Sequence, residues 1–128
     1  MPDDYIRLRL QGRRILVVED DYLQAEEMRV ALGALRATVI GPVPSVEEAL
    51  DRLAAEDPPD AAVLDVRLGR GPVFPLVDVL RRAGVPVVFA SASPHWSLPE
   101  PYEDLPHCEK PLDMGELLLA LAGVARAR

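Results

Sequence analysis

Apolar and polar residues along the chain follow two alternating patterns. Short apolar runs bounded by turn-forming residues are typical of buried strands, and they occur at 14–18, 38–40, 61–64 and about 86–90. The short segment 107–109 is expected to form the last strand. Between these runs, apolar residues recur every three or four positions, which predicts amphipathic helices. Because strands and helices alternate five times, we expect a parallel, three-layer α/β sandwich.

Capping residues and breakers predict where several of these elements begin and end. Asp20 or Asp21 can cap the helix after the first strand. Two capping boxes, Ser45–Glu48 and Asp113–Glu116, open later helices. Gly41-Pro42 is expected to end the second strand. The buried stripe expected for the first of these helices consists of Leu23, Met28, Ala31, Leu32 and Leu35.

The alternation breaks between Ser91 and His107, where four prolines interrupt the chain: Pro94, Pro99, Pro101 and Pro106. A proline inside a helix removes a hydrogen-bond donor and clashes with the preceding turn, at a cost of about 3 kcal/mol or more. We therefore expect no regular fourth helix there, or at most one turn. Trp96 and Tyr102 either pin this segment to the core or change between docked and exposed states.

Residues 1–14 are basic, whereas the rest of the chain is acidic. The stretch Tyr5–Leu10 alternates apolar and charged residues, which is the period of a half-buried strand. Two interpretations stay open: a frayed tail, or an extra strand or arm that packs on this or a neighbouring molecule. We place the main domain at residues 14–128.

Composition narrows the class of protein. At 128 residues with 49% apolar residues, the chain is expected to form one globular domain. The formal net charge of −7 argues against nonspecific binding to nucleic acid or to an anionic membrane. No apolar run approaches the roughly 20 residues that span a bilayer, and no secretory signal opens the chain. Cys108 is the only cysteine, which fits a reducing cytoplasm.

Chemically active residue types follow the predicted strands. Glu19 and Asp20 follow the first strand, Asp65 the third, Ser91 the fourth, and the only lysine, Lys110, the fifth. In an open α/β sheet the carboxyl ends of the strands line the ligand crevice. Two like charges about 4 Å apart repel by roughly 4 kcal/mol, so clustered carboxylates need a cation or a proton. A carboxylate nucleophile, a Mg²⁺ site, a hydroxyl and an ammonium are the parts needed to form an aspartyl phosphate.

From residue 14 to about 126, the chain resembles the receiver domains of bacterial two-component signalling. The resemblance rests on the strand Ile15–Asp20 with its acidic pair, on Asp65 at the phosphoacceptor position, on Ser91 at the hydroxyl position and on Lys110-Pro111. It implies a flavodoxin-like (βα)5 fold with a parallel five-stranded sheet of order 2-1-3-4-5. It also implies a cis Lys110–Pro111 bond.

The resemblance assigns a role to each site residue. Glu19, Asp20, Asp65 and the backbone carbonyl of Arg67 would bind Mg²⁺ or Mn²⁺, and Asp65 would accept a phosphoryl group from a sensor histidine kinase. Most receivers carry an aromatic switch residue three positions before the lysine, where this chain has His107, so the usual rotamer switch is not expected.

A narrower resemblance is to the single-domain receivers called the FAT GUY family. It rests on Val73–Leu80, Phe89–Ser93, Leu105–Pro106 and Glu109–Pro111, although Ser91 and Ala92 replace the Thr and Gly of the signature. The fourth helix of this subgroup tends to be short or mobile. The resemblance implies a stress-response or phosphate-sink role for this chain.

The expected function is therefore a single-domain response regulator. It would not be an enzyme beyond its own phosphorylation and autodephosphorylation, and it would act on an unknown downstream protein or as a phosphate sink. The alternative is a receiver-like module that binds a partner without phosphorylation. A dehalogenase-like phosphatase is disfavoured because Asp65-Val66-Arg67 lacks the second carboxylate of Asp-x-Asp. Apolar residues in excess of one stripe on the last helix favour homodimer or partner docking there: Leu117, Leu118, Leu119, Leu121, Ala122 and Val124.

Overall fold

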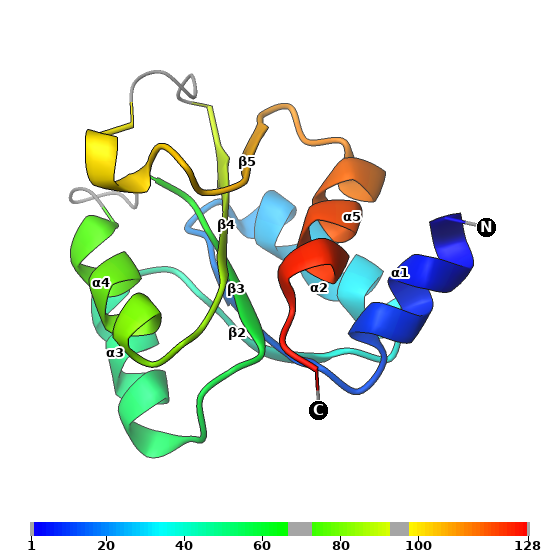
Figure 1. The fold of residues 1–128 in the computed structure, drawn as a ribbon, viewed down its shortest axis with the longest axis horizontal. Coiled ribbons are helices and arrows are strands. Elements are labelled where there is room, and N and C mark those ends of the chain that lie inside the picture. Colours follow the sequence, from blue (N-terminus) through cyan, green and yellow to red (C-terminus); the bar gives the residue numbers. More distant parts are fainter. Residues whose placement is uncertain (1, 67–72, 93–97, 128) are drawn as a thin grey trace.

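The chain folds around one parallel sheet, shown by the computed structural model in Figure 1. The structure describes residues 2–66, 73–92 and 98–127. The strand order is β2-β1-β3-β4-β5, as the receiver resemblance implied. The strands are β1 (Arg14–Val18), β2 (Thr38–Val43), β3 (Ala61–Leu64), β4 (Val87–Ser91) and β5 (His107–Glu109). The structure therefore confirms the predicted bounds of three strands, 14–18, 61–64 and 107–109.

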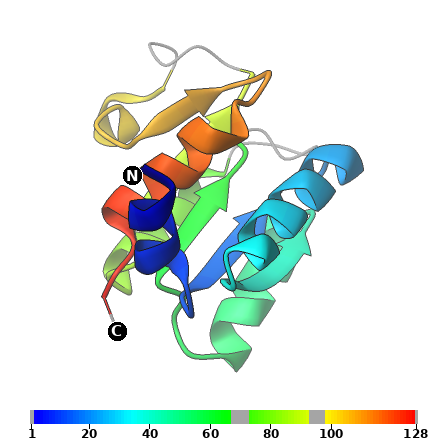
Figure 2. The ribbon, with the colours of Figure 1, turned by 90° about the vertical axis from the view of Figure 1, so that its right-hand side faces the viewer.

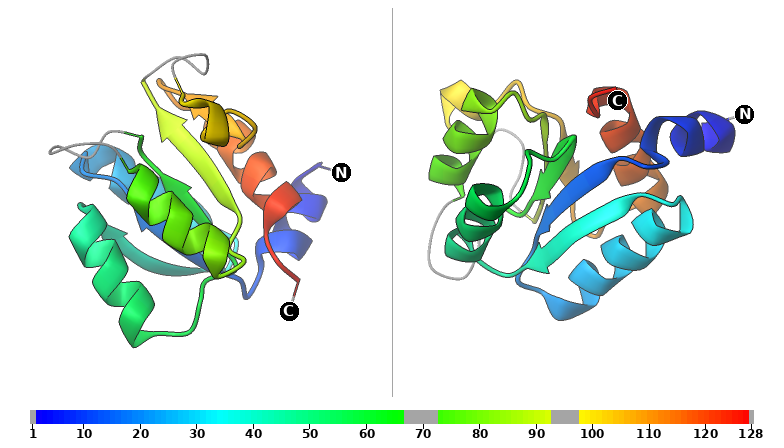
Figure 3. Two further views of the ribbon diagram at one scale, coloured as in Figure 1. Left: turned by 60° about the vertical axis from the view of Figure 1, so that its left-hand side comes forward. Right: turned by 90° about the horizontal axis from the view of Figure 1, so that it is seen from below.

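Helices cover both faces of the sheet, which confirms the predicted three-layer sandwich. The helices α3 (Val46–Ala55) and α4 (Phe74–Arg82) lie on one face, while α2 (Tyr22–Ala34) and α5 (Met114–Val124) lie on the other, as Figures 2 and 3 show. A further helix, α1 (Pro2–Leu10), packs beside α5. Within the described residues, none of the helices is long and apolar enough to cross a membrane.

The core has two halves because successive strand residues point to opposite faces of the sheet. In β1, Leu16 and Val18 join the cluster under α3 and α4, whereas Ile15 and Val17 join the cluster under α1, α2 and α5. All residues of β3 and β4 are buried. Strands covered on both faces appear as continuous apolar runs, which is why they could be identified from sequence.

The predicted helix caps form, but one end of the α2 stripe is wrong. Asp21 caps α2 by accepting from the backbone N–H of Gln24 at 3.1 Å. Met28 and Leu32 are buried as predicted, whereas Leu23 is 71% exposed. Leu23 lies in the first turn of the helix, and the buried side of α2 begins at Ala25 instead.

The second strand does not end at Gly41-Pro42, which corrects the prediction. β2 continues to Val43 through a cis Gly41–Pro42 bond, and its register against β1 shifts between Leu16 and Val18. Gly41 has a φ of +97°, and an added Cβ would lie 2.6 Å from the backbone nitrogen of Val43. Glycine is therefore required where the bent strand passes close to itself.

The segment between β4 and β5 contains a single 3₁₀ turn among its described residues, η2 (Glu100–Tyr102). This agrees with the expected absence of a regular fourth helix. Tyr102 attaches the turn to α4. Its ring stacks on that of Phe74 with 4.5 Å between the ring centroids, and its hydroxyl donates to the Asp78 carboxylate at 2.9 Å. Trp96, the other aromatic residue considered for this role, lies outside the described residues.

The N-terminal segment is a helix and not the extra strand that was one alternative, and it packs on this molecule as an arm beside α5. Ile6 and Leu10 are buried against α5, and the Arg9 guanidinium donates to the carbonyls of Ala122 and Ala125 at 2.8 and 2.7 Å. The apolar residues at positions 6 and 10 fit both periods, because four residues is one helical turn as well as two strand repeats. Contact with α5 selects the helix, and the buried side chains are not those of a frayed tail.

We expect Leu10→Ala to lower the free energy of unfolding by about 2–4 kcal/mol, because Leu10 is fully buried between α1 and the core. Chemical denaturation of the whole chain measures this loss. Leu8→Ala is the matched control on the same helix, since Leu8 is 68% exposed and should change stability by no more than about 0.5 kcal/mol. Equal, small effects of both substitutions would contradict the packing of α1.

We expect Gly41→Ala to destabilise the fold by about 1–3 kcal/mol, because alanine is strained at this φ and its methyl group would collide with the backbone. Gly33→Ala is the opposite case. Gly33 is helical with open space around its Cβ position, so alanine should raise stability by about 0.5–1 kcal/mol. Thermal unfolding of both variants would show midpoints moving in opposite directions. Two shifts of the same sign would contradict this account.

Candidate functional site

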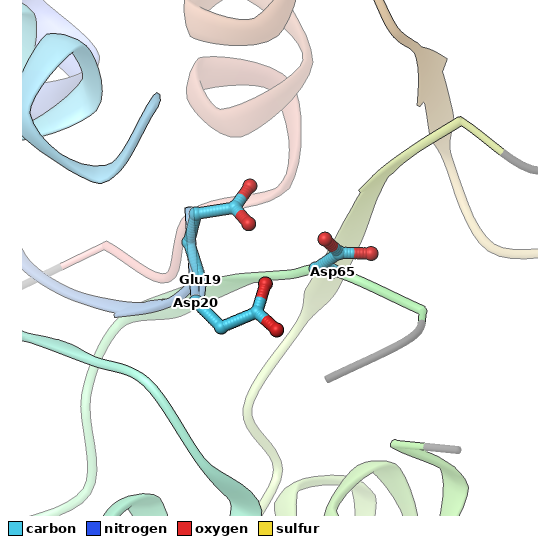
Figure 4. A group of neighbouring side chains, drawn as sticks. All are labelled: Glu19, Asp20 and Asp65. Atoms are coloured by element: carbon cyan, nitrogen blue, oxygen red, sulfur yellow. The ribbon is translucent and has the colours of Figure 1, made fainter. Parts of the chain in front are cut away.

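Three carboxylates converge at the carboxyl ends of β1 and β3, as Figure 4 shows. Glu19 and Asp20 follow β1, and Asp65 follows β3, its direct neighbour in the sheet. One oxygen from each carboxylate lies within 4.8 Å of the others. The convergence predicted from the strand ends is therefore present.

Backbone hydrogen bonds hold the carboxylates in place. The N–H of Glu19 donates to the carbonyl of Val43 at 3.0 Å, and the N–H of Asp65 donates to the carbonyl of Val18 at 3.0 Å. Both bonds extend the sheet ladder one residue past the strands. The side chain of Asp21 is engaged as the cap of α2, which leaves its exposed neighbour Asp20 to complete the cluster.

Lys110 neutralises part of this cluster. Its ammonium Nζ lies 2.8 Å from Glu19 Oε1 and 2.9 Å from Asp65 Oδ2, so it bridges the two buried carboxylates. Its backbone N–H donates to the carbonyl of Ser91 at 3.0 Å, which ties the end of β5 to the end of β4. The Lys110–Pro111 bond is cis, as the receiver resemblance implied.

Burial and pairing shift the proton affinities of two groups. Burial raises the pKa of Glu19 to about 7, although the hydrogen bond from Lys110 and the backbone N–H of Asp21 act in the opposite direction. Burial by itself would lower the pKa of Lys110. The bonds to Glu19 and Asp65 more than offset that effect, so the pKa of Lys110 is raised and its ammonium stays charged.

The donor set fits a hard divalent cation. Carboxylate oxygens are the ligands that Mg²⁺ and Ca²⁺ prefer, and oxygens within 4.8 Å of one another can share one ion at ligand distances of about 2.0–2.6 Å. Lys110 supplies only one positive charge to three carboxylates, so the cluster has charge left for a cation. Glu19, Asp20 and Asp65 could therefore bind a divalent metal.

The structure brings most, but not all, of the predicted site residues together. Glu19, Asp20, Asp65 and Lys110 come together directly. Ser91 is buried at the end of β4, beside Lys110 through the backbone bond. The backbone carbonyl of Arg67, expected as a metal ligand, lies outside the described residues.

Residues that the sequence analysis did not connect with the site also border it. Tyr22, Pro42 and Pro44 line a pocket together with Glu19 and Asp20. Tyr22 lies in α2 and the two prolines lie at the end of β2, and these residues form no sequence motif together. The only sequence signal was their position just after two strand ends.

The raised pKa of Glu19 predicts how stability depends on pH. Its carboxyl has a pKa of about 7 in the fold against 4.5 as the reference value, so the folded state binds more protons between these limits. The contribution of Glu19 to stability is therefore full below about pH 4.5 and is lost as pH rises through about 7. The glutamine side chain of Glu19→Gln does not ionise, so this variant does not lose stability from position 19 as pH rises.

We expect the unfolding free energy of Glu19→Gln, relative to the unsubstituted chain, to rise by up to about 1.4 kcal/mol per pH unit across this window. Chemical denaturation in EDTA at several pH values from about 5 to about 8 measures the difference. A difference that stays constant over the range would mean that burial does not raise the pKa of Glu19.

Comparisons with known proteins place this geometry in a family. No family model matches the sequence, and no curated protein matches it. Among solved structures, SdrG from Sphingomonas melonis Fr1 is 34% identical, with a TM-score of 0.76 over 91% of this chain and 97% of SdrG. The PhyR response regulator REC domain from Erythrobacter litoralis is 20% identical, with a TM-score of 0.75 over 92% of this chain and 95% of that domain.

The response regulator PhyR from Brucella abortus has a TM-score of 0.81 at 22% identity, over 96% of this chain and 51% of PhyR. This chain therefore spans about half the length of that PhyR. The narrower FAT GUY subgroup is not confirmed and stays a prediction. The identity to SdrG over nearly its whole length, together with the shared fold and the converging strand-end residues, shows that the chain belongs to the receiver domains of response regulators.

Proposed function

We propose that this chain is a single-domain response regulator that accepts a phosphoryl group on Asp65 from the phosphohistidine of a sensor histidine kinase. The observation that carries the proposal is the bridge made by Lys110, whose ammonium lies 2.9 Å from Asp65 inside an acidic cluster. A half-buried lysine at this point places a positive charge where the phosphoryl oxygens would arrive.

The residues divide the work of phosphoryl transfer. A carboxylate oxygen of Asp65 would attack phosphorus while the bond from phosphorus to the donor nitrogen breaks. Lys110 would move part of its pairing from Asp65 to the phosphoryl oxygens, and the hydroxyl of Ser91 would donate to another. Glu19 and Asp20 would hold Mg²⁺ with Asp65, and the bound ion supplies positive charge to the transferring group. Beyond this self-phosphorylation and autodephosphorylation, the chain would have no enzymatic activity.

A partner protein would recognise the phosphorylated state. The phosphoryl group adds about −1.5 to −2 charges beside Ser91 and Lys110, at the ends of β4 and β5. The output would be contact with a cytoplasmic downstream protein or removal of phosphate from a kinase. Docking through α5 remains part of this proposal, with Leu119 as its half-exposed apolar residue. A module that binds without phosphorylation is the rival, and the complete charge cluster supports the phosphoacceptor.

We expect the intact mass to increase by one phosphoryl group after incubation with Mg²⁺ and acetyl phosphate. Asp65→Asn and added EDTA should each abolish the gain, because one removes the nucleophile and the other the cation. Asp60→Asn is the matched control. Asp60 lies at the amino end of β3, at the other end of the strand from Asp65, and its carboxylate accepts from the backbone N–H of Arg14 at 2.8 Å. This variant should still be phosphorylated.

The result separates the two candidate functions. A gain that persists in Asp65→Asn would move the phosphoacceptor elsewhere. No gain from acetyl phosphate or from a phosphorylated histidine kinase, in a protein that also fails to bind Mg²⁺, would contradict the phosphoacceptor and favour the interaction module.

A further inference from the structure

A second feature lies beside the acidic cluster and has no role in the assignments above. It is a pocket of about 230 Å³ that shares Glu19 and Asp20 with the cluster. Its remaining surface comes from Tyr22, Ala25 and Glu26 in α2 and from Pro42 and Pro44 at the end of β2, and Tyr22 and the two prolines form its apolar wall. The pocket therefore joins a flat apolar wall to the carboxylates of the site.

Tyr22 contributes little to the folded core. Its side chain is 77% exposed, and it belongs to neither of the two core clusters. An aromatic ring and two proline rings offer flat surfaces on which a planar ring can stack. Glu19 and Asp20 place this wall directly beside Asp65, so a ring stacked on it would lie next to the site of phosphoryl transfer, whereas the Glu26 carboxylate is paired with the Arg29 guanidinium.

We propose that Tyr22, with Pro42 and Pro44, holds the leaving group of the phosphodonor when that group is an imidazole ring, and that Tyr22 thereby determines donor specificity. This inference rests on the proposed phosphotransfer to Asp65. An imidazole that is phosphorylated on one nitrogen and protonated on the other is planar, so its ring can stack on the apolar wall while its phosphoryl group lies at the charged site. The donor class is a phosphoramidate of imidazole, as in a phosphohistidine side chain.

The transfer balances without a further reactant. An oxygen of Asp65 forms the new bond to phosphorus, and the bond from phosphorus to the ring nitrogen breaks. The electron pair of that bond stays on the ring, which keeps its proton on the other nitrogen and leaves as neutral imidazole. Acetyl phosphate instead releases acetate, a small anion that has no ring to stack on Tyr22.

The test compares two small donors, monophosphoimidazole and acetyl phosphate, on the whole chain with Mg²⁺. Initial rates of phosphorylation are followed by intact mass for the unsubstituted chain, Tyr22→Ala and Tyr22→Phe. We expect Tyr22→Ala to lower the rate with monophosphoimidazole by about ten-fold and the rate with acetyl phosphate by less than about two-fold. Tyr22→Phe keeps the ring and should preserve the donor preference.

Leu23→Ala is the matched control. Leu23 is the next residue and is 71% exposed, but it lines a different groove, with Val30 and Met114. Its loss should leave both rates unchanged.

Three results would overturn the inference. They are equal losses with both donors in Tyr22→Ala, no loss with either donor, or the same selective loss in Leu23→Ala. If the unsubstituted chain accepts phosphate from neither small donor, this inference fails. The proposed function fails with it only if a phosphorylated histidine kinase also gives no gain and the chain does not bind Mg²⁺. If it accepts phosphate from both donors and Tyr22→Ala does not alter their ratio, only the role of Tyr22 fails.

Discussion

The ion pairs of Lys110 with Glu19 and Asp65 are the interaction on which this end of the molecule depends. Carboxylates buried a few ångströms apart repel strongly, and a charge that loses its partner in such a place is costly. The single ammonium makes it possible for β1 and β3 to end side by side on acidic residues. The backbone hydrogen bond from Lys110 to Ser91 ties the end of β5, which carries this ammonium, to the end of β4.

The β4–β5 side of the site is tied to the surface by ring contacts. Tyr102 of η2 stacks on Phe74, Phe74 contacts Phe89 edge-on at 6.2 Å, and Phe89 contacts His107 edge-on at 6.4 Å. Phe89 lies two residues before Ser91, and His107 three residues before Lys110. This row of rings therefore joins η2 and α4 to the two strands that carry Ser91 and precede Lys110. His107 takes part in the row even though it is not the usual aromatic residue of receivers.

The helix α1 changes how the apolar surface of α5 is understood. In the sequence, the last helix had more apolar residues than one buried stripe requires, which favoured an intermolecular interface. In the structure, Ile6 and Leu10 pack in the same cluster as Leu117, Leu121 and Ala122, while Arg9 binds the carbonyls at the end of α5. An intramolecular contact therefore accounts for part of that excess. Leu119 is the large apolar residue of α5 that stays exposed within the described residues.

Much of the architecture could be predicted because its signals are local. Strands buried on both faces must be continuous apolar runs, so 61–64 was identified at its observed bounds. Caps such as Asp21 and Ser45 act within four residues of themselves, and carboxylates at the ends of neighbouring parallel strands must meet. These relations do not depend on the rest of the fold.

Other features were decided by contacts between distant segments, which a local pattern does not encode. Residues 5–10 fit a strand and a helix equally well until α5 provides a surface for Ile6 and Leu10. The exposure of Leu23 depends on which side of α2 faces the sheet. The raised pKa of Glu19 depends on burial beneath several elements, and the pocket at Tyr22 needs the end of β2 beside the start of α2. The sequence by itself thus determined the strands and the charged groups at their ends. Tertiary structure decided which groups are paired, buried or accessible, because those properties arise only when the chain brings remote residues together.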